Sequence, residues 1–319
     1  MSTVADNLAA DYRLLREQVG LVDRSERGKL ALTGPEAKEF MQGQVTNDVE
    51  GLEPGTGCYA AFLTHKGKML GDLRVLDAGG ELLLDCERVA LQDLFGMIRR
   101  FKLGRAVELH KRTLERGLLS LIGPDARRIA GAEDLPEVEH SHRAGELAGA
   151  PVRLIATDLG VDVLCDAADT ERVAAALAKA GAAEATEAEA EVRRVETGRP
   201  RYGVDLDDTV IPQEAGLNAR AVSFEKGCYV GQETVARLYF RGKPNRHLRG
   251  LKLSGPAAHG DPLRLGQREV GRLGSVVESP LHGRIALALV RREAAPGDSL
   301  AVGDDGVRAQ VVDLPFAQA

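Results

Sequence analysis

The octet at residues 226–233 decides the fold assignment of this chain. It runs Lys226-Gly227-Cys228-Tyr229-Val230-Gly231-Gln232-Glu233. The residues after it, Glu233 to Leu238, favour a helix, so the sequence predicts Cys228 just before a helix or in its first turn. Unpaired N–H groups and the helix dipole would favour a thiolate there, and Lys226 and Arg237 would add positive charge nearby. Cys228 is therefore a candidate functional thiol.

The octet leaves the chemistry of that thiol open. A thiolate can act as a nucleophile, a redox group or a ligand of a metal or cluster. An isolated cysteine can equally be a small buried apolar residue. The flanking Gly227 and Gly231 argue against this buried alternative, because glycine tolerates positive φ and close backbone approach, which a core helix does not need.

Composition places the protein in a broad class. The chain has 319 residues and a formal net charge of −6. No apolar run approaches the ~18 residues of a membrane span, and the N-terminus lacks the features of a secretory signal. The four cysteines form no Cys-x-x-Cys pair, and the histidines show no metal-site spacing, so no metal site and no disulfide framework is predicted. We expect a cytoplasmic protein without a membrane partner, and the charge disfavours nucleic acid as a partner.

Hydrophobic patterns predict an α+β fold. The stretches 30–37 and 119–126 are alike, since each has a strand, a Gly-Pro turn and a helix start. This repeat predicts two related lobes, over residues 1–115 and 116–240. Short strands with Gly and Pro between them predict a small β-barrel over residues 241–319, after a basic linker. Helices are expected over residues 6–20, 36–42, 89–99, 125–130 and 171–178, and a further helix is expected to end at residue 194. Strands are expected over residues 29–33, 57–63, 69–76, 81–86 and 118–122.

A second informative segment runs from Arg193 to Asp205. It places Glu196 at the expected end of a helix, just before Gly198. A carboxylate there suits bidentate contact with an amidine-like ligand edge, such as the 2-amino-4-oxo face of a pterin. The alternative is a surface ion pair with Arg193 or Arg199.

Together these segments resemble the YgfZ family of folate-binding proteins, relatives of the glycine-cleavage aminomethyltransferase (T-protein). The octet looks like the YgfZ signature, and also like that of the mitochondrial counterpart that assists iron–sulfur cluster assembly. The resemblance covers essentially the whole chain. Further pieces that match the wider superfamily are Glu196-x-Gly198, Tyr202-Gly203, Glu214–Leu217, Gly20–Asp23, Gly34, Val45–Val49 and Gly67–Leu70.

The resemblance implies a folate-binding body of two α+β lobes (residues 1–240) followed by a C-terminal β domain. Its implied cofactor is tetrahydrofolate or a one-carbon derivative, and its implied partners are iron–sulfur enzymes or assembly proteins. Glu196 aligns with the glutamate that anchors the pterin. The expected cofactor contacts are Glu196, Tyr202, Asp85 and Arg237, and the expected functional group consists of Cys228, Lys226 and Gln232. In this group Lys226 would hold the thiolate by charge and Gln232 would help to orient it.

Two of these contacts have alternatives. Asp85 aligns roughly with a ligand-contacting asparagine of the transferase, but it can also be the N-cap of the next helix, which we prefer. Arg237 opens a basic stretch that can be a solvated linker, a contact for a folate polyglutamate tail, or an RNA site, in that order of preference. The stretch consists of Arg237, Arg241, Lys243, Arg246 and Arg249 with Tyr239 and Phe240 among them, and His65, Lys66 and Lys68 form a second cationic cluster.

The chain departs from the transferase pattern in one strand. The transferase's catalytic aspartate is the first of an acidic pair, and Gly71 stands at that position here, followed by Asp72. Because strand side chains alternate between faces, Asp72 should point the other way. Glycine-cleavage activity is therefore disfavoured. The leading hypothesis is a tetrahydrofolate-binding accessory protein for iron–sulfur proteins; the alternatives are a folate-dependent one-carbon transferase or demethylase, and an RNA-modification factor.

Overall fold

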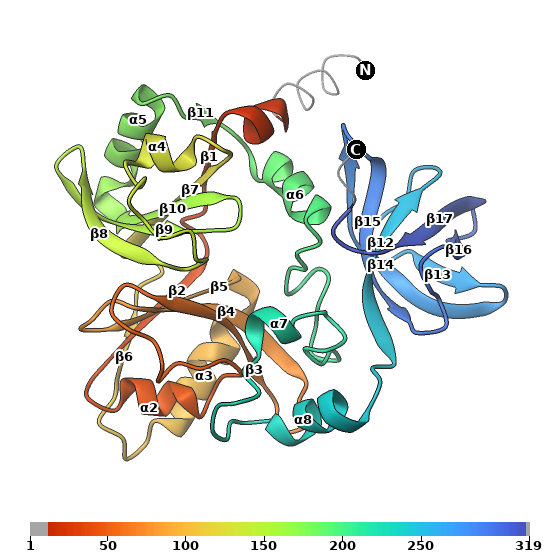
Figure 1. Cartoon of the computed structure of the whole chain (residues 1–319), viewed down its shortest axis with the longest axis horizontal. Coiled ribbons are helices and arrows are strands. Elements are labelled where there is room, and N and C mark those ends of the chain that lie inside the picture. The colour runs from red at the N-terminus through yellow and green to blue at the C-terminus, as the bar shows by residue number, and fades with distance from the viewer. Residues whose placement is uncertain (1–11, 317–319) are drawn as a thin grey trace. The chain divides into compact units, whose positions relative to one another are not determined.

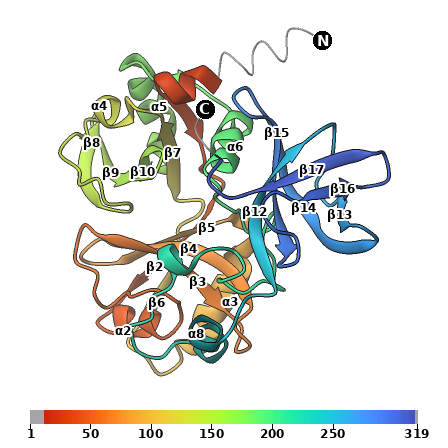
Figure 2. The same ribbon diagram turned by 45° about the vertical axis from the view of Figure 1, so that its right-hand side comes forward.

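The computed structural model describes residues 12–316, which form two compact units. Each unit is built from several stretches of the chain. The first unit contains residues up to 63, residues 70–190 and residues 220–230. The second contains residues 64–69, residues 191–219 and the chain from 231 onward. Figures 1 and 2 show the elements of both units.

The first unit contains a five-stranded antiparallel sheet in the order β3-β4-β5-β2-β6. Its helices cover one face, where Leu91 of α3 packs beside Gly28 of β2 (Figure 1). Its elements are β2 (Gly28–Thr33), α2 (Ala37–Gln42), β3 (Gly57–Leu63), β4 (Met69–Asp77), β5 (Leu82–Cys86), the 3₁₀ turn η1 (Arg88–Ala90), α3 (Leu91–Phe101) and β6 (Glu108–Lys111).

A six-stranded sheet completes the first unit, in the order β11-β1-β7-β10-β9-β8. Leu76 and Leu83 of the first sheet pack against Ile155 of this second sheet, so the two sheets share an apolar contact. The elements are β1 (Gly20–Asp23), β7 (Arg116–Ile122), α4 (Ala126–Ala130), β8 (His142–Leu147), β9 (Ala150–Ala156), β10 (Gly160–Asp166), η2 (Ala167–Asp169), α5 (Thr170–Lys179) and β11 (Ala183–Glu184).

The predicted repeat corresponds to two matching turns. In β2–α2 a Cβ on Gly34 would lie 2.2 Å from the carbonyl oxygen of Ala106. In β7–α4 a Cβ on Gly123 would lie 2.3 Å from the carbonyl oxygen of Gln18. Both strand–turn–helix pieces therefore use a glycine where a backbone carbonyl approaches closely. The first strand of the described residues, β1, pairs with β7 and so joins the second sheet.

The second unit ends in a closed six-stranded barrel with the strand order β12-β15-β14-β13-β16-β17. Its interior is filled by small and branched apolar residues such as Leu263, Ala286 and Val311. The strands are β12 (Arg246–Leu253), β13 (Pro262–Leu265), β14 (Arg268–Ser279), β15 (Gly283–Arg291), β16 (Ser299–Val302) and β17 (Val307–Val312). Three helices precede them: α6 (Glu187–Glu196), α7 (Asn218–Ala221) and α8 (Gln232–Arg241).

The predicted fold class, two α+β lobes followed by a small β-barrel, is confirmed. Most predicted elements lie within a few residues of the observed ones. No strand was expected from the sequence at seven positions, which are β1, β6, β8, β9, β10, β11 and β13. Of the helix expected over residues 6–20, residues 12–17 are helical and residues 6–11 lie outside the described part. Within the described residues, none of the helices is long and apolar enough to span a membrane.

Candidate functional site

Lys226 fixes the octet to the first unit through its ammonium group. Its Nζ donates hydrogen bonds to the carbonyl oxygens of Gln42 at 2.6 Å, Val45 at 2.7 Å and Asn47 at 2.8 Å. A lysine ammonium has three donors, and here all three bind backbone carbonyls. Burial lowers the pKa of Lys226 to about 8. The structure thus shows an anchoring role for Lys226, and its charge effect on Cys228 stays a prediction.

Tyr229 holds the other side of the loop. Its side chain is buried, and the ammonium of Lys226 lies 5.2 Å from the centre of its ring, as in a cation–π contact. The N–H of Val230 donates to the carbonyl oxygen of Gly43 at 3.2 Å. The residues on both sides of Cys228 are therefore tied to the first unit.

Cys228 itself is exposed. All four cysteines lie in the described part of the chain, and of these Cys86 and Cys165 are buried and Cys58 is half-buried. Burial raises the pKa of the Cys58 thiol to about 12 and also raises the pKa of Cys86 and Cys165, which disfavours their thiolates. The buried-cysteine alternative is thus wrong for Cys228.

The sequence predicted Cys228 either just before the following helix or in its first turn, and the structure shows the first of these two positions. Helix α8 starts at Gln232 with Gly231 as its N-cap, so Cys228 precedes the helix and does not lie in its first turn. Gly231 has φ of 84°, a left-handed conformation that glycine adopts without strain. Gly227 shows neither a positive φ nor a close neighbour at its α-carbon, so the tight backbone predicted around it is wrong. The boundary between the two units falls inside the octet, after Val230.

Glu196 is the last residue of α6 and is buried in the second unit. Ser279 donates its hydroxyl to Oε1 of Glu196 at 2.6 Å, and Arg193 donates to Oε2 at 2.8 Å. The predicted ion pair with Arg193 is therefore present, although its carboxylate is buried and not at the surface. The contact between Glu196 and a pterin stays a prediction.

The other candidates on the second unit have different surroundings. Tyr202 is buried and forms a parallel bridge with Leu206. Gln232 is half-buried as the first residue of α8. Arg237 is exposed and pairs with Glu233 one turn away at 2.5 Å. The predicted roles of these three residues stay predictions.

Asp85 is not a helix cap. It lies inside β5, and Glu87 is the residue that precedes the 3₁₀ turn. Its carboxylate is buried between two arginines, with Arg27 donating to Oδ1 at 2.8 Å and Arg74 donating to Oδ2 at 2.7 Å. These two cations hold the pKa of Asp85 well below its usual range against the opposing effect of burial. The preferred N-cap interpretation is therefore wrong.

Asp72 of β4 is a buried carboxyl beside the glycine at position 71. Tyr59 of β3 donates its hydroxyl to Oδ2 of Asp72 at 2.7 Å. Burial raises the pKa of Asp72 to about 6, with the Tyr59 hydrogen bond opposing that rise. Arg220 of α7 lies 4.9 Å from the centre of the Tyr59 ring and pairs with Glu139. Tyr59 and Asp72 lie on adjacent strands that the sequence predicts a short loop apart, whereas Arg220 and Glu139 come from distant parts of the chain that no local signal connects to this site.

The other face of β4 is closed at Gly71. A Cβ on Gly71 would lie 2.6 Å from two ring carbons of Phe62 and 2.7 Å from the Cβ of Ala90. No aspartate fits at position 71 in this backbone. The predicted alternation is confirmed, because Asp72 bonds to Tyr59 while position 71 faces Phe62 and Ala90.

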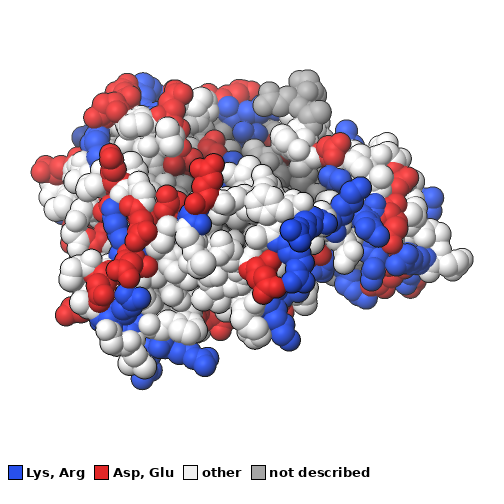
Figure 3. All heavy atoms as spheres, turned by 60° about the horizontal axis from the view of Figure 1, so that its bottom comes forward, with Lys and Arg blue, Asp and Glu red and all other residues white. Residues whose placement is uncertain are grey.

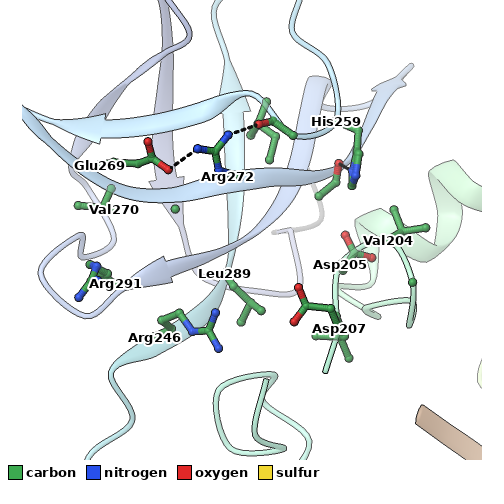
Figure 4. Close-up of a pocket in the computed structure, with 16 residues that line it drawn as sticks. Val204, Asp205, Asp207, Arg246, His259, Glu269, Val270, Arg272, Leu289 and Arg291 are labelled. Carbon is green, nitrogen blue, oxygen red and sulfur yellow. Dashed lines mark hydrogen bonds and ion pairs between the residues drawn. The ribbon is translucent and has the colours of Figure 1, made fainter. Parts of the chain in front are cut away.

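The second unit also carries a groove of about 580 Å³ between residues 203–207 and strands β14 and β15 (Figure 4). Its charged side chains are largely paired. Arg272 bonds to Glu269 at 2.8 Å, and Arg246 bonds to Glu214 at 2.8 Å. Arg246 of the basic stretch lines the groove, whereas none of the expected cofactor contacts and none of the residues grouped with Cys228 does. Among residues 12–316 no group of three or more His, Cys, Asp or Glu side chains is arranged to hold a metal ion.

Comparison with known proteins shows similarity along almost the whole chain. Residues 2–226 match the GCVT N-terminal domain, and residues 246–318 match the glycine cleavage T-protein C-terminal barrel domain. An aminomethyltransferase of Rubrobacter xylanophilus is 30% identical over 321 residues, which cover 97% of this chain and 86% of that protein. An aminomethyltransferase of Halothermothrix orenii is 28% identical over 97% of this chain and 91% of its own.

A solved structure gives the same fold. The glycine cleavage system aminomethyltransferase T from Bartonella henselae superposes with a TM-score of 0.85, over 97% of this chain and 89% of that one. Its sequence identity is 22%, so this similarity concerns the fold alone.

Proposed function

The chain belongs to the glycine cleavage T-protein family, and from this premise we propose that it is a YgfZ-like, tetrahydrofolate-binding accessory protein for the assembly, maturation or repair of iron–sulfur proteins. Cys228 supplies the thiol through which it acts on these client proteins. The bound folate is tetrahydrofolate or a one-carbon derivative.

One observation carries this proposal: the octet exposes a single thiol from an anchored loop. Lys226 and Tyr229 hold the loop on both sides, and Cys228 between them reaches solvent. A thiol that acts on another protein must be accessible, whereas a structural cysteine is normally buried. The anchoring through three carbonyls limits the positions that Cys228 can take, which favours contact with a partner of defined shape.

The surroundings of Glu196 fit an anchor for the folate. Its carboxylate is buried in the second unit, as a site that recognises N–H donors in a planar ring requires. Ser279 orients one oxygen, and Arg193, which reaches the surface, holds the other. When the amidine edge of a pterin binds, it replaces Arg193 as the partner of the Glu196 carboxylate, since water can solvate the released guanidinium.

A rescue experiment tests the proposal. In a bacterium that lacks its own homologue, aconitase, a [4Fe–4S] enzyme, would be assayed under oxidative stress with wild type, Cys228→Ser and Glu196→Ala at matched expression. We expect rescue by wild type and loss of rescue by both variants. The matched control is Cys165→Ser, which removes a buried thiol and should rescue. Rescue by Cys228→Ser at the wild-type level would exclude the thiol role.

Folate binding is tested separately by isothermal titration with tetrahydrofolate under anaerobic conditions. We expect Glu196→Ala to weaken binding at least about tenfold, because one charge-assisted hydrogen-bonded contact contributes about 1.5–3 kcal/mol. Cys228→Ser should bind like wild type. Equal affinity of Glu196→Ala and wild type would remove Glu196 from the folate site and leave the role of Cys228 intact.

A second candidate function, folate-dependent one-carbon transfer, is favoured by Asp72. A buried carboxyl with a pKa of about 6 and a hydroxyl partner has the properties of a general acid or base near neutral pH. This observation weakens the argument that the glycine at position 71 excludes catalysis. The test supplies tetrahydrofolate with sarcosine or dimethylglycine and measures methyltetrahydrofolate, because transfer of the methyl group from the amine nitrogen to the folate leaves the demethylated amine and needs no oxidant. Turnover by wild type that Asp72→Asn abolishes would establish this function, and no turnover would leave the accessory role.

A further inference from the structure

Positive charge is concentrated in the second unit. The chain as a whole has a net charge of −6, yet Lys and Arg outnumber Asp and Glu in the residues of the second unit, and the first unit is strongly acidic. Figure 3 shows Lys and Arg gathered in a band on one face of the molecule. Such an asymmetry favours binding of a negatively charged partner to one part of the protein.

Helix α8 presents two large aromatic side chains to solvent. Tyr239 is 51% exposed and Phe240 is 68% exposed, and their rings meet edge to face with centroids 5.0 Å apart. Arg241 and Lys243 follow directly and are exposed. Exposed aromatic rings next to basic side chains are typical of protein-binding surfaces, in which Tyr, Phe and Arg are enriched.

The other basic residues of the stretch are used within the second unit. Arg246 bonds to both carboxylate oxygens of Glu214, at 3.1 and 2.8 Å. Arg249 pairs with Asp313 at 3.2 Å. The linker interpretation is therefore wrong for these two arginines, because they stabilise the start of the barrel. Arg241 and Lys243 remain as the exposed cations beside the two aromatic rings.

The second cationic cluster reaches the same helix. Residues 64–69 form a turn of the second unit in which Gly67 packs against Thr234, so close that a Cβ on Gly67 would lie 2.8 Å from the Cβ of Thr234. This contact places His65 and Lys66, both exposed, beside the first turn of α8. The helix therefore has exposed cations at both ends. We call Tyr239, Phe240, Arg241 and Lys243 the α8 surface.

We propose that the α8 surface docks the acidic face of an iron–sulfur client protein, an inference that rests on the function proposed above. Because α8 begins directly after the octet, a client that binds this surface is held by the same stretch of chain that carries Cys228. The cations supply charge complementarity, which speeds encounter and selects acidic partners. The aromatic rings supply the apolar contact that keeps the partner bound.

A protein fits the α8 surface better than a nucleic acid does. Single-stranded nucleic acid stacks its bases on open aromatic faces. Tyr239 and Phe240 are nearly perpendicular, at 81°, so they offer no continuous platform for successive bases.

The test measures binding of the full chain to purified aconitase and rescue of its activity in cells. Two variants change the α8 surface independently, Tyr239→Ala with Phe240→Ala and Arg241→Glu with Lys243→Glu. We expect each pair to weaken binding about tenfold or more and to reduce rescue, and wild-type binding to weaken as salt is raised. Unchanged thermal melting and folate affinity would show that the variants fold.

Matched controls lie on the first unit, at the end of α3. Phe101 and Leu103 are 47% and 82% exposed, and Arg99 and Arg100 are exposed cations. Phe101→Ala with Leu103→Ala, and Arg99→Glu with Arg100→Glu, remove the same kinds of surface elsewhere. Both control pairs should bind and rescue like wild type, and an equal loss in them would overturn the proposal.

Three further outcomes of these experiments distinguish failure of the docking proposal for the α8 surface from failure of the proposed accessory function. If the α8 variants bind and rescue like wild type while Cys228→Ser does not rescue, docking is overturned and the proposed function stands. If the α8 variants lose binding to a ten-nucleotide oligo-uridine and keep aconitase binding, the surface is a nucleic-acid site and docking is overturned. If wild type neither binds nor rescues, the proposed function fails and the client is excluded as the occupant.

Discussion

Two aspartates on neighbouring strands of the same sheet show how differently a buried carboxyl can behave. Asp85 on β5 accepts hydrogen bonds from two arginines, which hold its pKa well below the usual range. Asp72 on β4 accepts one hydrogen bond from a neutral tyrosine, and burial raises its pKa to about 6. Both are buried, so burial alone does not decide the outcome.

This difference shows that the hydrogen-bond partners of a buried carboxyl determine whether it stays ionised or can take up and release a proton near neutral pH. Two guanidinium groups compensate the loss of water around Asp85. A tyrosine hydroxyl compensates only part of that loss for Asp72. Asp85 is thus a structural anion, and Asp72 is able to exchange a proton near neutral pH.

The largest expected effect follows from removing the structural anion. Asp85→Ala leaves Arg27 and Arg74 buried without their shared partner, and we expect it to lower the free energy of unfolding by about 3–5 kcal/mol. Urea denaturation at pH 7 measures this loss. The matched control is Asp166→Ala, which breaks an exposed pair with Arg116 and should cost at most about 1 kcal/mol. Equal small losses in both variants would mean that the Arg27–Asp85–Arg74 cluster is not a structural unit.

The next effect is the pH dependence that Asp72 confers. Its pKa is about 6 in the folded state against 3.8 in the unfolded chain, so between pH 4 and 6 the folded state binds the additional proton. Stability from this group is complete below pH 4 and is lost as pH rises through 6, by up to about 3 kcal/mol. Asp85 has the opposite sign, since its contribution is present above pH 4 and is lost as pH falls.

Asp72→Asn tests this sign. The variant should lack the loss of stability between pH 4 and 7, so its advantage over wild type grows as pH rises. Urea denaturation across that range measures the difference, and Asp93→Asn on the exposed side of α3 is the control that should follow wild type. Parallel pH profiles of wild type and Asp72→Asn would refute the raised pKa.

The sequence predicted the face of each residue better than it predicted the partner. Strand alternation correctly separated position 71 from Asp72, because the period of two is a local property. The N-cap interpretation of Asp85 followed from its place at a strand end before an expected helix, and the arginines that stabilise it in the strand lie 58 and 11 residues away. No local pattern contains those pairings.

In the octet, too, local sequence patterns do not reveal contacts with distant residues. An exposed thiol next to a helix was predictable from the glycines and from the helical residues that follow. The anchor was not, because the three carbonyls that hold Lys226 belong to residues 42–47, and only the folded chain brings them to the octet. The fold class was accessible because it depends on many short repeated signals, whereas the site depends on a few distant contacts.

A third prediction concerns Gly71, which lies on the face of β4 opposite to Asp72. Gly71→Ala would place a Cβ 2.6 Å from the Phe62 ring, and we expect a loss of about 2 kcal/mol from overpacking. Gly96→Ala is the matched control, because it lies inside α3 with open space around its α-carbon and should stabilise by about 0.5–1 kcal/mol. Thermal denaturation distinguishes the two signs. Tolerance of Gly71→Ala would mean that the strand can shift and that an aspartate at position 71 is sterically allowed.

The smallest expected effect concerns the hydrogen bond that distinguishes Asp72 from an isolated buried acid. Tyr59→Phe removes the donor and should cost about 1 kcal/mol at pH 7. Because that bond favours the ionised carboxyl, its loss should raise the pKa of Asp72 above 6 and move the pH transition upward. The ring under Arg220 stays in place, so the contact between Arg220 and position 59 is kept.

The double variant Tyr59→Phe with Asp72→Asn decides whether the two residues act together. If the hydroxyl acts through the carboxylate, the cost of Tyr59→Phe at pH 7 differs between the wild-type and Asp72→Asn backgrounds by about 1 kcal/mol. Additive costs in a double-mutant cycle would instead show that Tyr59 stabilises the sheet independently of Asp72. In that case nothing from Tyr59 would oppose the effect of burial on the pKa of Asp72, and the difference between Asp72 and Asp85 would rest only on the two arginines.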